Sequence, residues 1–95
     1  MKTVMINKIT YYVLSDENNL LDNMDISEKL TDYFDDFDYI VGDISYNALR
    51  LKGFKRNSKS NNKYNRIDFL EEYLSNYCAY GAKWFIISKI YKDIK

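Results

Sequence analysis

Two short strand-forming runs lie close together in the middle of this 95-residue chain. The first, residues 39–41, is aromatic and β-branched, and the Gly42 and Asp43 that follow are typical of a turn. The second, residues 49–54, alternates apolar with mostly basic side chains, which predicts a strand with one apolar and one basic face. Together they predict an antiparallel hairpin that reverses through residues 44–47, with a positive φ at Gly42 and with Asp43 capping the turn.

The N-terminal part of the chain predicts one strand and one helix. Residues 9–14 are β-branched and aromatic and end in a polar turn cluster, so we expect a strand there, starting as early as Val4. Asp25 stands three residues before Glu28, as in a helix N-cap. Apolar side chains then recur at helical spacing, and these are Ile26, Leu30, Tyr33 and Phe34. The pattern predicts a helix that begins at Asp25.

The C-terminal part predicts a loop, a helix and a strand. Residues 55–65 are rich in Asn, Ser and Lys without apolar periodicity, which indicates a loop of about ten residues. A second helix is expected from Arg66, with Gly81 as its left-handed C-cap. The apolar side of that helix consists of Ile67, Leu70, Tyr73, Leu74, Tyr77 and Cys78. Residues 84–91 are apolar on both faces for part of their length, which predicts a central or covered strand.

These elements follow the order β-α-β-β-α-β. We therefore expect one α+β domain over residues 1–95, in which two helices cover one face of a four-stranded, mostly antiparallel sheet in the ferredoxin-like arrangement. A different strand order, or a fifth strand from residues 4–8, is the alternative. A chain of this length buries roughly 60–65% of its unfolded surface, enough for one core without a metal or disulfide.

Charge is distributed unevenly along a chain whose formal net charge is zero. Residues 16–43 contain ten acids and one base, whereas residues 50–66 contain seven bases and no acid. The single cysteine, Cys78, excludes an internal disulfide framework and indicates the reducing cytoplasm. The N-terminal residues lack the apolar core of a signal peptide, and no apolar run approaches the ~20 residues of a bilayer span.

Catalysis finds little support in the residue types present. The chain has no histidine, which excludes histidine-based triads and metal sites. Asp43 and Tyr46 are the candidate pair for an enzyme, but we expect Asp43 to cap the turn instead. Cys78 lies on the apolar side of the expected helix, which indicates a packing role. We therefore expect a protein that is not an enzyme and needs no cofactor or metal.

The basic segment and the loop that follows it are the main candidates for binding. Cations on a loop beside exposed aromatic rings are suited to gripping phosphates and stacking bases. The candidate nucleic-acid-binding residues are Arg50, Lys52, Phe54, Lys55, Arg56, Lys59, Lys63, Tyr64 and Arg66. The same charges also suit a solvated loop that protects a sheet edge, or pairing with the acidic half of the molecule.

The central segment resembles the YutD-like family of small proteins from low-GC Gram-positive bacteria and their wall-less relatives. Residues 39–43, Tyr46 and residues 49–54 match its hallmark segment, and matches continue at Tyr73, Leu74, Tyr77, Cys78, Gly81, Trp84 and Phe85. Ile44 and Ala48 stand where the family has Trp and Gln, and Ala82 stands where it has a second Cys. The resemblance implies a cytoplasmic bacterial domain, and the missing Cys excludes a paired-cysteine redox or metal site.

The functional hypothesis is a small, non-enzymatic binding module of the cytoplasm. Its first expected partner is RNA, DNA or a ribonucleoprotein, bound through the basic strand and loop. The alternative is a protein-interaction or regulatory adaptor that uses the separation of its acidic and basic segments. No membrane partner is expected.

Overall fold

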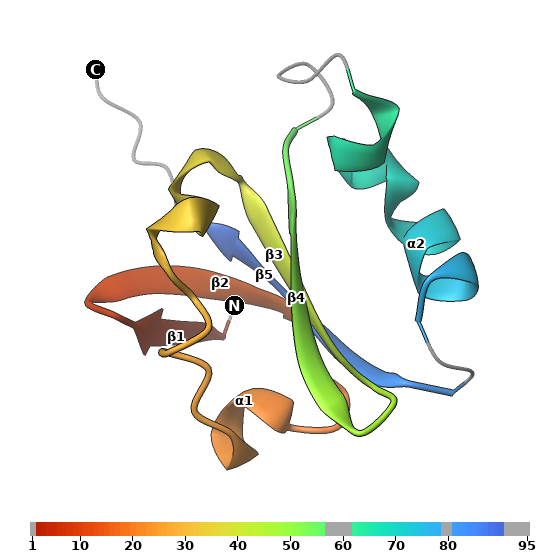
Figure 1. Cartoon of the computed structure of the whole chain (residues 1–95). Coiled ribbons are helices and arrows are strands. Elements are labelled where there is room, and N and C mark those ends of the chain that lie inside the picture. Colours follow the sequence, from red (N-terminus) through yellow and green to blue (C-terminus); the bar gives the residue numbers. More distant parts are fainter. Residues whose placement is uncertain (1, 57–61, 79–80, 91–95) are drawn as a thin grey trace.

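One five-stranded antiparallel sheet organises the chain (Figure 1). The computed structural model describes residues 2–56, 62–78 and 81–90. The strands are β1 (Thr3–Ile6), β2 (Ile9–Ser15), β3 (Tyr39–Ser45), β4 (Ala48–Phe54) and β5 (Lys83–Lys89), in the spatial order β1-β2-β5-β3-β4. Every neighbouring pair is antiparallel. β5 therefore lies at the centre of the sheet, as its two apolar faces predicted.

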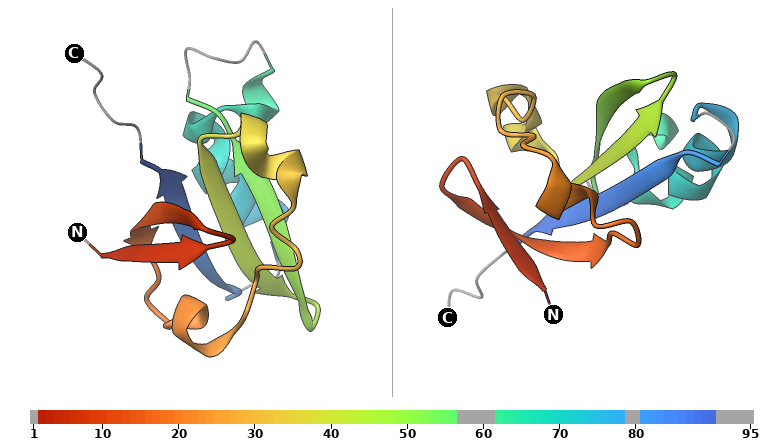
Figure 2. Two further views of the ribbon diagram at one scale, coloured as in Figure 1. Left: turned by 90° about the vertical axis from the view of Figure 1, so that its left-hand side faces the viewer. Right: turned by 90° about the horizontal axis from the view of Figure 1, so that it is seen from below.

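The expected four-stranded, ferredoxin-like fold is wrong. The sheet has a fifth strand, β1, and β5 lies between β2 and β3. The two layers beside the sheet are on opposite faces, since one core cluster joins the sheet to residues 20–37 and the other joins it to residues 67–74. The view from below in Figure 2 shows β3 and β5 between these layers. Both faces of the central strands are apolar, so both faces need a cover.

Two tight turns with positive φ connect the hairpins. Asn7 and Lys8 have φ values of 54° and 69°, and Tyr46 and Asn47 have 55° and 64°. Two consecutive residues with positive φ define the type I′ turn, whose twist matches that of the strands it joins. The expected positive φ at Gly42 is wrong, because Gly42 lies inside β3, three residues before this turn begins.

Two glycines in neighbouring strands each lie against a phenylalanine ring. A Cβ atom at Gly42 would overlap the ring of Phe85, its direct partner on β5. A Cβ atom at Gly53 would overlap the ring of Phe37. Glycine is needed at both positions for this close approach and not for an unusual φ. The two rings thereby fill the space above the sheet that side chains at positions 42 and 53 would otherwise occupy.

The layer on the Phe85 face contains little helix. Its elements are α1 (Leu20–Asn23) and the 3₁₀ helix η1 (Asp32–Asp36). The helix expected from Asp25 is wrong, because the Asp25 carboxylate accepts a hydrogen bond from the N–H of Ser27 at 2.9 Å and closes a local turn. Ile26, Leu30 and Phe34 are nevertheless buried, whereas Tyr33 is 68% exposed. The apolar pattern thus identified most of the buried residues but not the backbone.

Side chains from the first hairpin and from the loop after β2 form hydrogen bonds with the backbone of this layer. Asn7 donates from Nδ2 to the carbonyl oxygens of Ser27 at 3.0 Å and Leu30 at 2.9 Å. The carboxylate of Asp16 accepts from the N–H groups of Leu20 and Leu21 at the start of α1. These bonds satisfy backbone groups in the irregular parts of this layer.

The opposite layer consists of η3 (Lys63–Asn65), η4 (Ile67–Phe69) and α2 (Leu70–Asn76). It packs on a core of Val41, Phe54, Phe69 and Ile86. Arg66 forms a parallel bridge with Lys55, the residue after β4. The expected second helix is present from Ile67 onward, with a 3₁₀ first turn. Gly81 has a φ of +70°, as expected for a left-handed position, although α2 ends earlier at Asn76.

Candidate functional site

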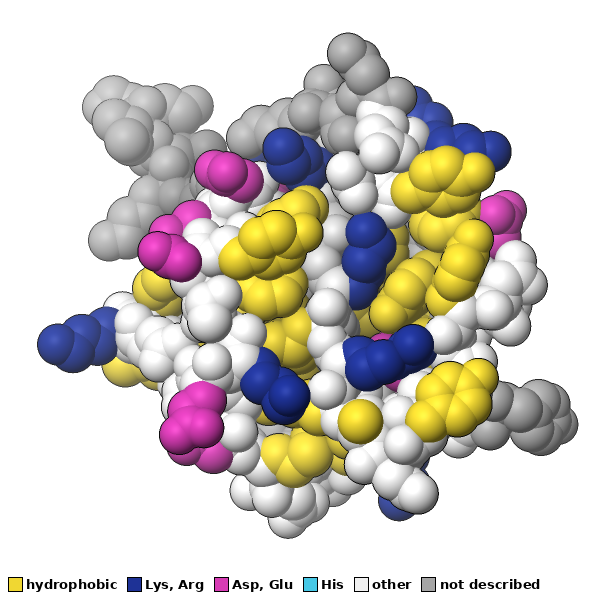
Figure 3. All heavy atoms as spheres, viewed as in Figure 1, with side chains coloured by type: hydrophobic (Ala, Val, Ile, Leu, Met, Phe, Trp, Pro, Cys, Tyr) yellow, Lys and Arg dark blue, Asp and Glu magenta, His cyan; other side chains and the backbone are white. Residues whose placement is uncertain are grey.

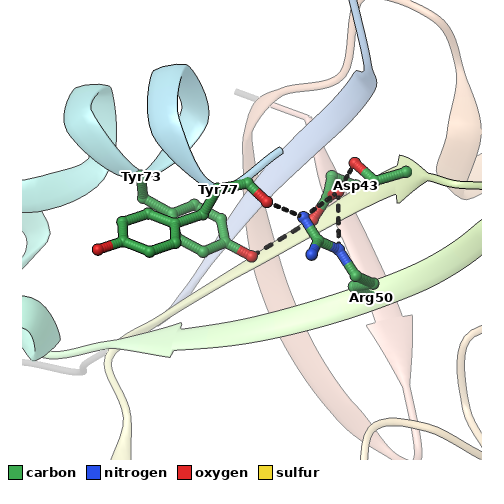
Figure 4. Close-up of polar contacts among 5 residues, drawn as sticks. Asp43, Arg50, Tyr73 and Tyr77 are labelled. Carbon is green, nitrogen blue, oxygen red and sulfur yellow. Dashed lines mark hydrogen bonds and ion pairs between the residues drawn. The ribbon is translucent and has the colours of Figure 1, made fainter. Parts of the chain in front are cut away.

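A buried aspartate lies under the layer formed by α2. Asp43 on β3 has a fully buried side chain and faces Arg50, its direct partner on β4. Arg50 donates to one carboxylate oxygen from Nε at 3.2 Å and from Nη2 at 3.1 Å, and the Ser45 hydroxyl also donates to that oxygen. The Tyr73 hydroxyl donates to the other oxygen at 3.4 Å (Figure 4). Asp43 is therefore a satisfied structural anion rather than a turn cap.

The same arginine joins the sheet to the end of α2. Nη2 of Arg50 donates to the carbonyl oxygen of Tyr77, the C-cap residue of α2, at 2.6 Å. A cation at this position also stabilises the negative end of a helix. Arg50 thus connects β3, β4 and α2 through one side chain, which fixes how α2 lies over the basic face of β4 (Figure 4).

We expect Tyr73 to ionise only at strongly alkaline pH. Burial, reinforced by the Asp43 carboxylate, raises the pKa of Tyr73 to about 12. Because the pKa of tyrosine in the unfolded chain is near 10, the folded protein holds the Tyr73 proton more tightly. The protonated hydroxyl therefore contributes its full stabilisation of the fold below about pH 10, and this contribution is lost as pH rises through 12. In a titration that follows phenolate absorbance at 295 nm, Tyr73→Phe should reduce the absorbance rise near pH 12 by the contribution of one tyrosine. Loss of a phenol near pH 10 would contradict this assignment.

A groove with aromatic walls lies beside this network, between β4 and α2. Its lining consists of Lys52, Tyr64, Phe69, Tyr73 and Tyr77, with a volume of about 240 Å³. Tyr73 and Tyr77 are stacked, with ring centroids 6.0 Å apart and planes at 18°, and Tyr64 meets Phe69 edge-on at 5.0 Å. On this face of the molecule, Figure 3 shows cationic side chains along the middle with hydrophobic side chains beside them.

Lys52 provides the positive charge in the lining of this groove. Its ammonium donates to Oδ1 of Asn65 at 3.1 Å and lies 5.2 Å from the centroid of the Phe54 ring. Burial lowers the pKa of Lys52 below its ordinary value. In the described part of the chain its polar partner is thus a neutral amide and not a carboxylate. An anionic group entering the groove would meet a cation whose charge is only weakly compensated.

The residues predicted to bind nucleic acid differ in their burial and in their partners. The expectation that Phe54 is exposed is wrong, because Phe54 is fully buried under α2, where Tyr73 packs edge-on against it. Arg50 is bound to Asp43. Arg56 lies 3.6 Å from an Asp38 oxygen, and Arg66 lies 3.8 Å from an Asp68 oxygen. The basic face of β4 was correctly identified from its alternation. On that face α2 covers Phe54 and leaves Arg50 and Lys52 partly exposed.

The remaining predicted residues lie near the end of β4 or in the groove. Lys55 and Lys63 are placed over the rings of Phe37 and Tyr64, at 5.7 and 5.0 Å from the centroids. Tyr64 is 48% exposed at the rim of the groove. Lys59 lies outside the residues that the structure describes. As a set, these residues remain a prediction for nucleic-acid binding.

The structure also shows where the residues of the other sequence hypotheses lie. Tyr46 is 78% exposed in the β3–β4 turn, whereas Asp43 is buried under α2, so the pair considered for catalysis does not share a site. Cys78 is half-buried, and burial together with the nearby Asp43 raises the pKa of its thiol. No helix in the described ranges is long and apolar enough to cross a membrane.

Comparison with known proteins agrees with the resemblance in the central segment. Residues 5–88 match the family described as "YutD-like: Putative antitoxin YutD-like", and the chain belongs to this family. One relative is "Putative antitoxin YutD" of Bacillus subtilis (strain 168), which is 39% identical over 66 residues, covering 67% of this chain and 71% of that protein. The solution NMR structure of protein yutD from B. subtilis has a TM-score of 0.74 at 28% identity, covering 100% of this chain and 87% of that chain.

Proposed function

We propose that this protein is a non-enzymatic, cytoplasmic protein-binding module whose binding surface is the groove between β4 and α2. The observation that carries the proposal is the groove itself, which combines four aromatic rings with the weakly compensated charge of Lys52. Tyrosine rings that are partly exposed are typical of the residues that contribute most to protein interfaces. The B. subtilis relative is named a putative antitoxin, and an antitoxin implies a toxin as its counterpart.

The size of the groove favours a protein side chain over a cofactor or substrate. Small-molecule sites usually have volumes of about 300–1,000 Å³, and the groove measures about 240 Å³. The nearby polar network is also arranged for structure, because Asp43 is bound by Arg50 and Ser45. A carboxylate held in this way is a poor general base, which supports a binding function without catalysis.

Co-purification from the native host tests the proposal. The tagged protein, after nuclease treatment, should retain a protein partner that is lost when Lys52→Met removes the charge but keeps the alkyl stem. The matched control is Lys29→Met, which removes an exposed lysine from the opposite layer and should retain the partner. Equal retention by the two variants, or a partner that disappears with nuclease, would overturn the proposal.

Nucleic-acid binding is a second candidate because several cations gather where β4 leaves the sheet. The bridge between Lys55 and Arg66 brings the two ends of the basic loop together. Lys55 and Lys63 have aromatic rings as their neighbours, and both Arg56 and Arg66 are paired with acids. The pI of about 6.2 is low for a nucleic-acid-binding domain, which makes this the weaker candidate.

A gel-shift titration at low salt tests this second candidate. If the loop binds nucleic acid, the variant Lys55→Glu, Arg56→Glu, Lys59→Glu should weaken binding at least tenfold and make its salt dependence shallower, because fewer counterions are released. If the groove is instead a protein-binding surface, the wild-type protein should bind nucleic acid only weakly, with no tight complex for this variant to remove. Loss of a tight complex in the variant would establish the nucleic-acid function instead.

A further inference from the structure

We propose that the groove between β4 and α2 binds an acidic segment of the partner protein, with one aromatic side chain inserted between flanking carboxylates. This inference rests on the proposed protein-binding function and specifies the chemistry of the partner. It is carried by the shape of the aromatic lining, by the charge in that lining and by the volume available.

The aromatic lining presents ring surfaces to an incoming side chain. Phe69 is buried, whereas Tyr64 and Tyr77 are about half exposed, so Phe69 forms the floor and the two tyrosines form the rim. The approach of Tyr64 to Phe69 is edge-on, and that of Tyr73 to Tyr77 is stacked. Aromatic pairs prefer these two geometries, and a further ring can extend either arrangement. An aliphatic anchor would gain only the apolar contact.

The charge of the lining favours an anionic neighbour for that ring. Among the residues that the structure describes, the lining contains Lys52 and no acidic residue. Lys63 adds a second cation, 5.0 Å from the centroid of the Tyr64 ring at the rim. Arg50 contributes less, because Asp43 already neutralises it. Carboxylates placed on either side of the anchor would therefore meet Lys52 and Lys63, and a cationic segment would be repelled.

The groove suits one anchor and not a long polyanion. A volume of about 240 Å³ holds a single large side chain, below the usual range for a ligand site. Single-stranded nucleic acid instead requires a basic track along its backbone, with several bases stacked in succession. Beyond the groove, the arginines of this region are paired with Asp43, Asp38 and Asp68. The geometry thus points to a peptide segment.

Titration of the full-length, ¹⁵N-labelled protein with short blocked peptides tests the inference. The first peptide has a central tryptophan between paired glutamates, the second has lysines in place of the glutamates, and the third has alanine in place of tryptophan. The first should shift the amide signals of residues lining the groove and bind at least tenfold more tightly than either other peptide. Lys52→Met and Tyr64→Ala should each weaken it several-fold, and Lys29→Met should leave it unchanged.

Several outcomes would overturn the inference. The first two are equal affinity for the acidic and basic peptides, and amide shifts centred on β1 and β2. The third is tighter binding of an oligothymidine than of the acidic peptide. The fourth is a set of amide shifts that depend on protein concentration alone, which would show that a second copy fills the groove. If co-purification depends on Lys52 while the acidic peptide fails to bind, the inference fails and the proposed function stands. If co-purification does not depend on Lys52 and the acidic peptide also fails to bind, both the inference and the proposed function fail.

Discussion

Gly42→Ala should destabilise the protein by about 2–3 kcal/mol, because the added methyl group has no space in the core. Its Cβ would overlap the ring of Phe85, which is fully buried in the centre of the sheet. The neighbouring Leu51 side chain, with Cδ2 at 3.1 Å from that Cβ position, limits movement on the other side. The measurement is the free energy of unfolding from urea denaturation monitored by circular dichroism.

A double-mutant cycle separates the overlap with Phe85 from a general effect of alanine. Phe85→Leu removes the ring and is itself destabilising, because it leaves a cavity. Gly42→Ala should be less destabilising in the Phe85→Leu background than in the wild type, by about 1 kcal/mol or more, since contacting residues couple. An unchanged effect would show that the ring does not set the requirement for glycine.

Asp43→Asn should also destabilise the protein, by about 2–3 kcal/mol. The substitution keeps the shape of the side chain but removes the charge that binds Arg50 and replaces one acceptor oxygen with a donor. Breaking a fully buried ion pair typically costs about 3–5 kcal/mol, and the smaller figure here reflects Arg50, whose side chain is 36% exposed and can be hydrated.

The matched control for Asp43→Asn is Asp36→Asn, which changes an exposed acid on η1 and should alter stability by less than about 0.5 kcal/mol. Because Arg50 also holds the carbonyl oxygen of Tyr77, Asp43→Asn should increase amide hydrogen exchange in α2 more than in β2. Equal unfolding free energies for Asp43→Asn and the wild type would contradict a structural role for the buried pair.

The central hairpin shows what local sequence patterns reveal and where they stop. Alternation along residues 49–54 correctly separated the two faces of β4, because side chains alternate in any strand. The roles of Gly42 and Asp43 were missed, because glycine and aspartate are typical of turns and nothing local shows that a ring from β5 and an arginine from β4 meet them. The turn itself uses Tyr46, a residue that seldom adopts positive φ.

The helix expected from Asp25 does not form, because apolar spacing alone does not make a helix. Ile26, Leu30 and Phe34 are buried as their spacing predicted, but the segment between them closes turns through Asp25 and continues as a 3₁₀ helix. Acidic residues near the end of the expected helix oppose its dipole and weaken it further. The absence of that helix, the fifth strand β1 and the central position of β5 account for the error in fold class.

One sequence pattern indicates the aromatic wall of the groove, but the same pattern is also expected of the buried side of a helix. Phe69, Tyr73 and Tyr77 recur every four residues, which places three aromatic rings along one line of η4 and α2. The helical spacing alone assigns Tyr73 and Tyr77 to the apolar side of the helix. Only the contact between α2 and β4 shows that this aromatic line and Lys52 form one surface.

Site-specific photo-crosslinking in the native host tests the binding surface most directly. Benzoylphenylalanine would replace Tyr64 at the rim of the groove or, as the control, Tyr33 on the opposite layer, and both tyrosines are well exposed. We expect a crosslinked protein partner from position 64 that is absent from position 33 and is lost with Lys52→Met. Crosslinks from position 33 alone, or crosslinks to nucleic acid from position 64, would contradict a protein-binding groove between β4 and α2.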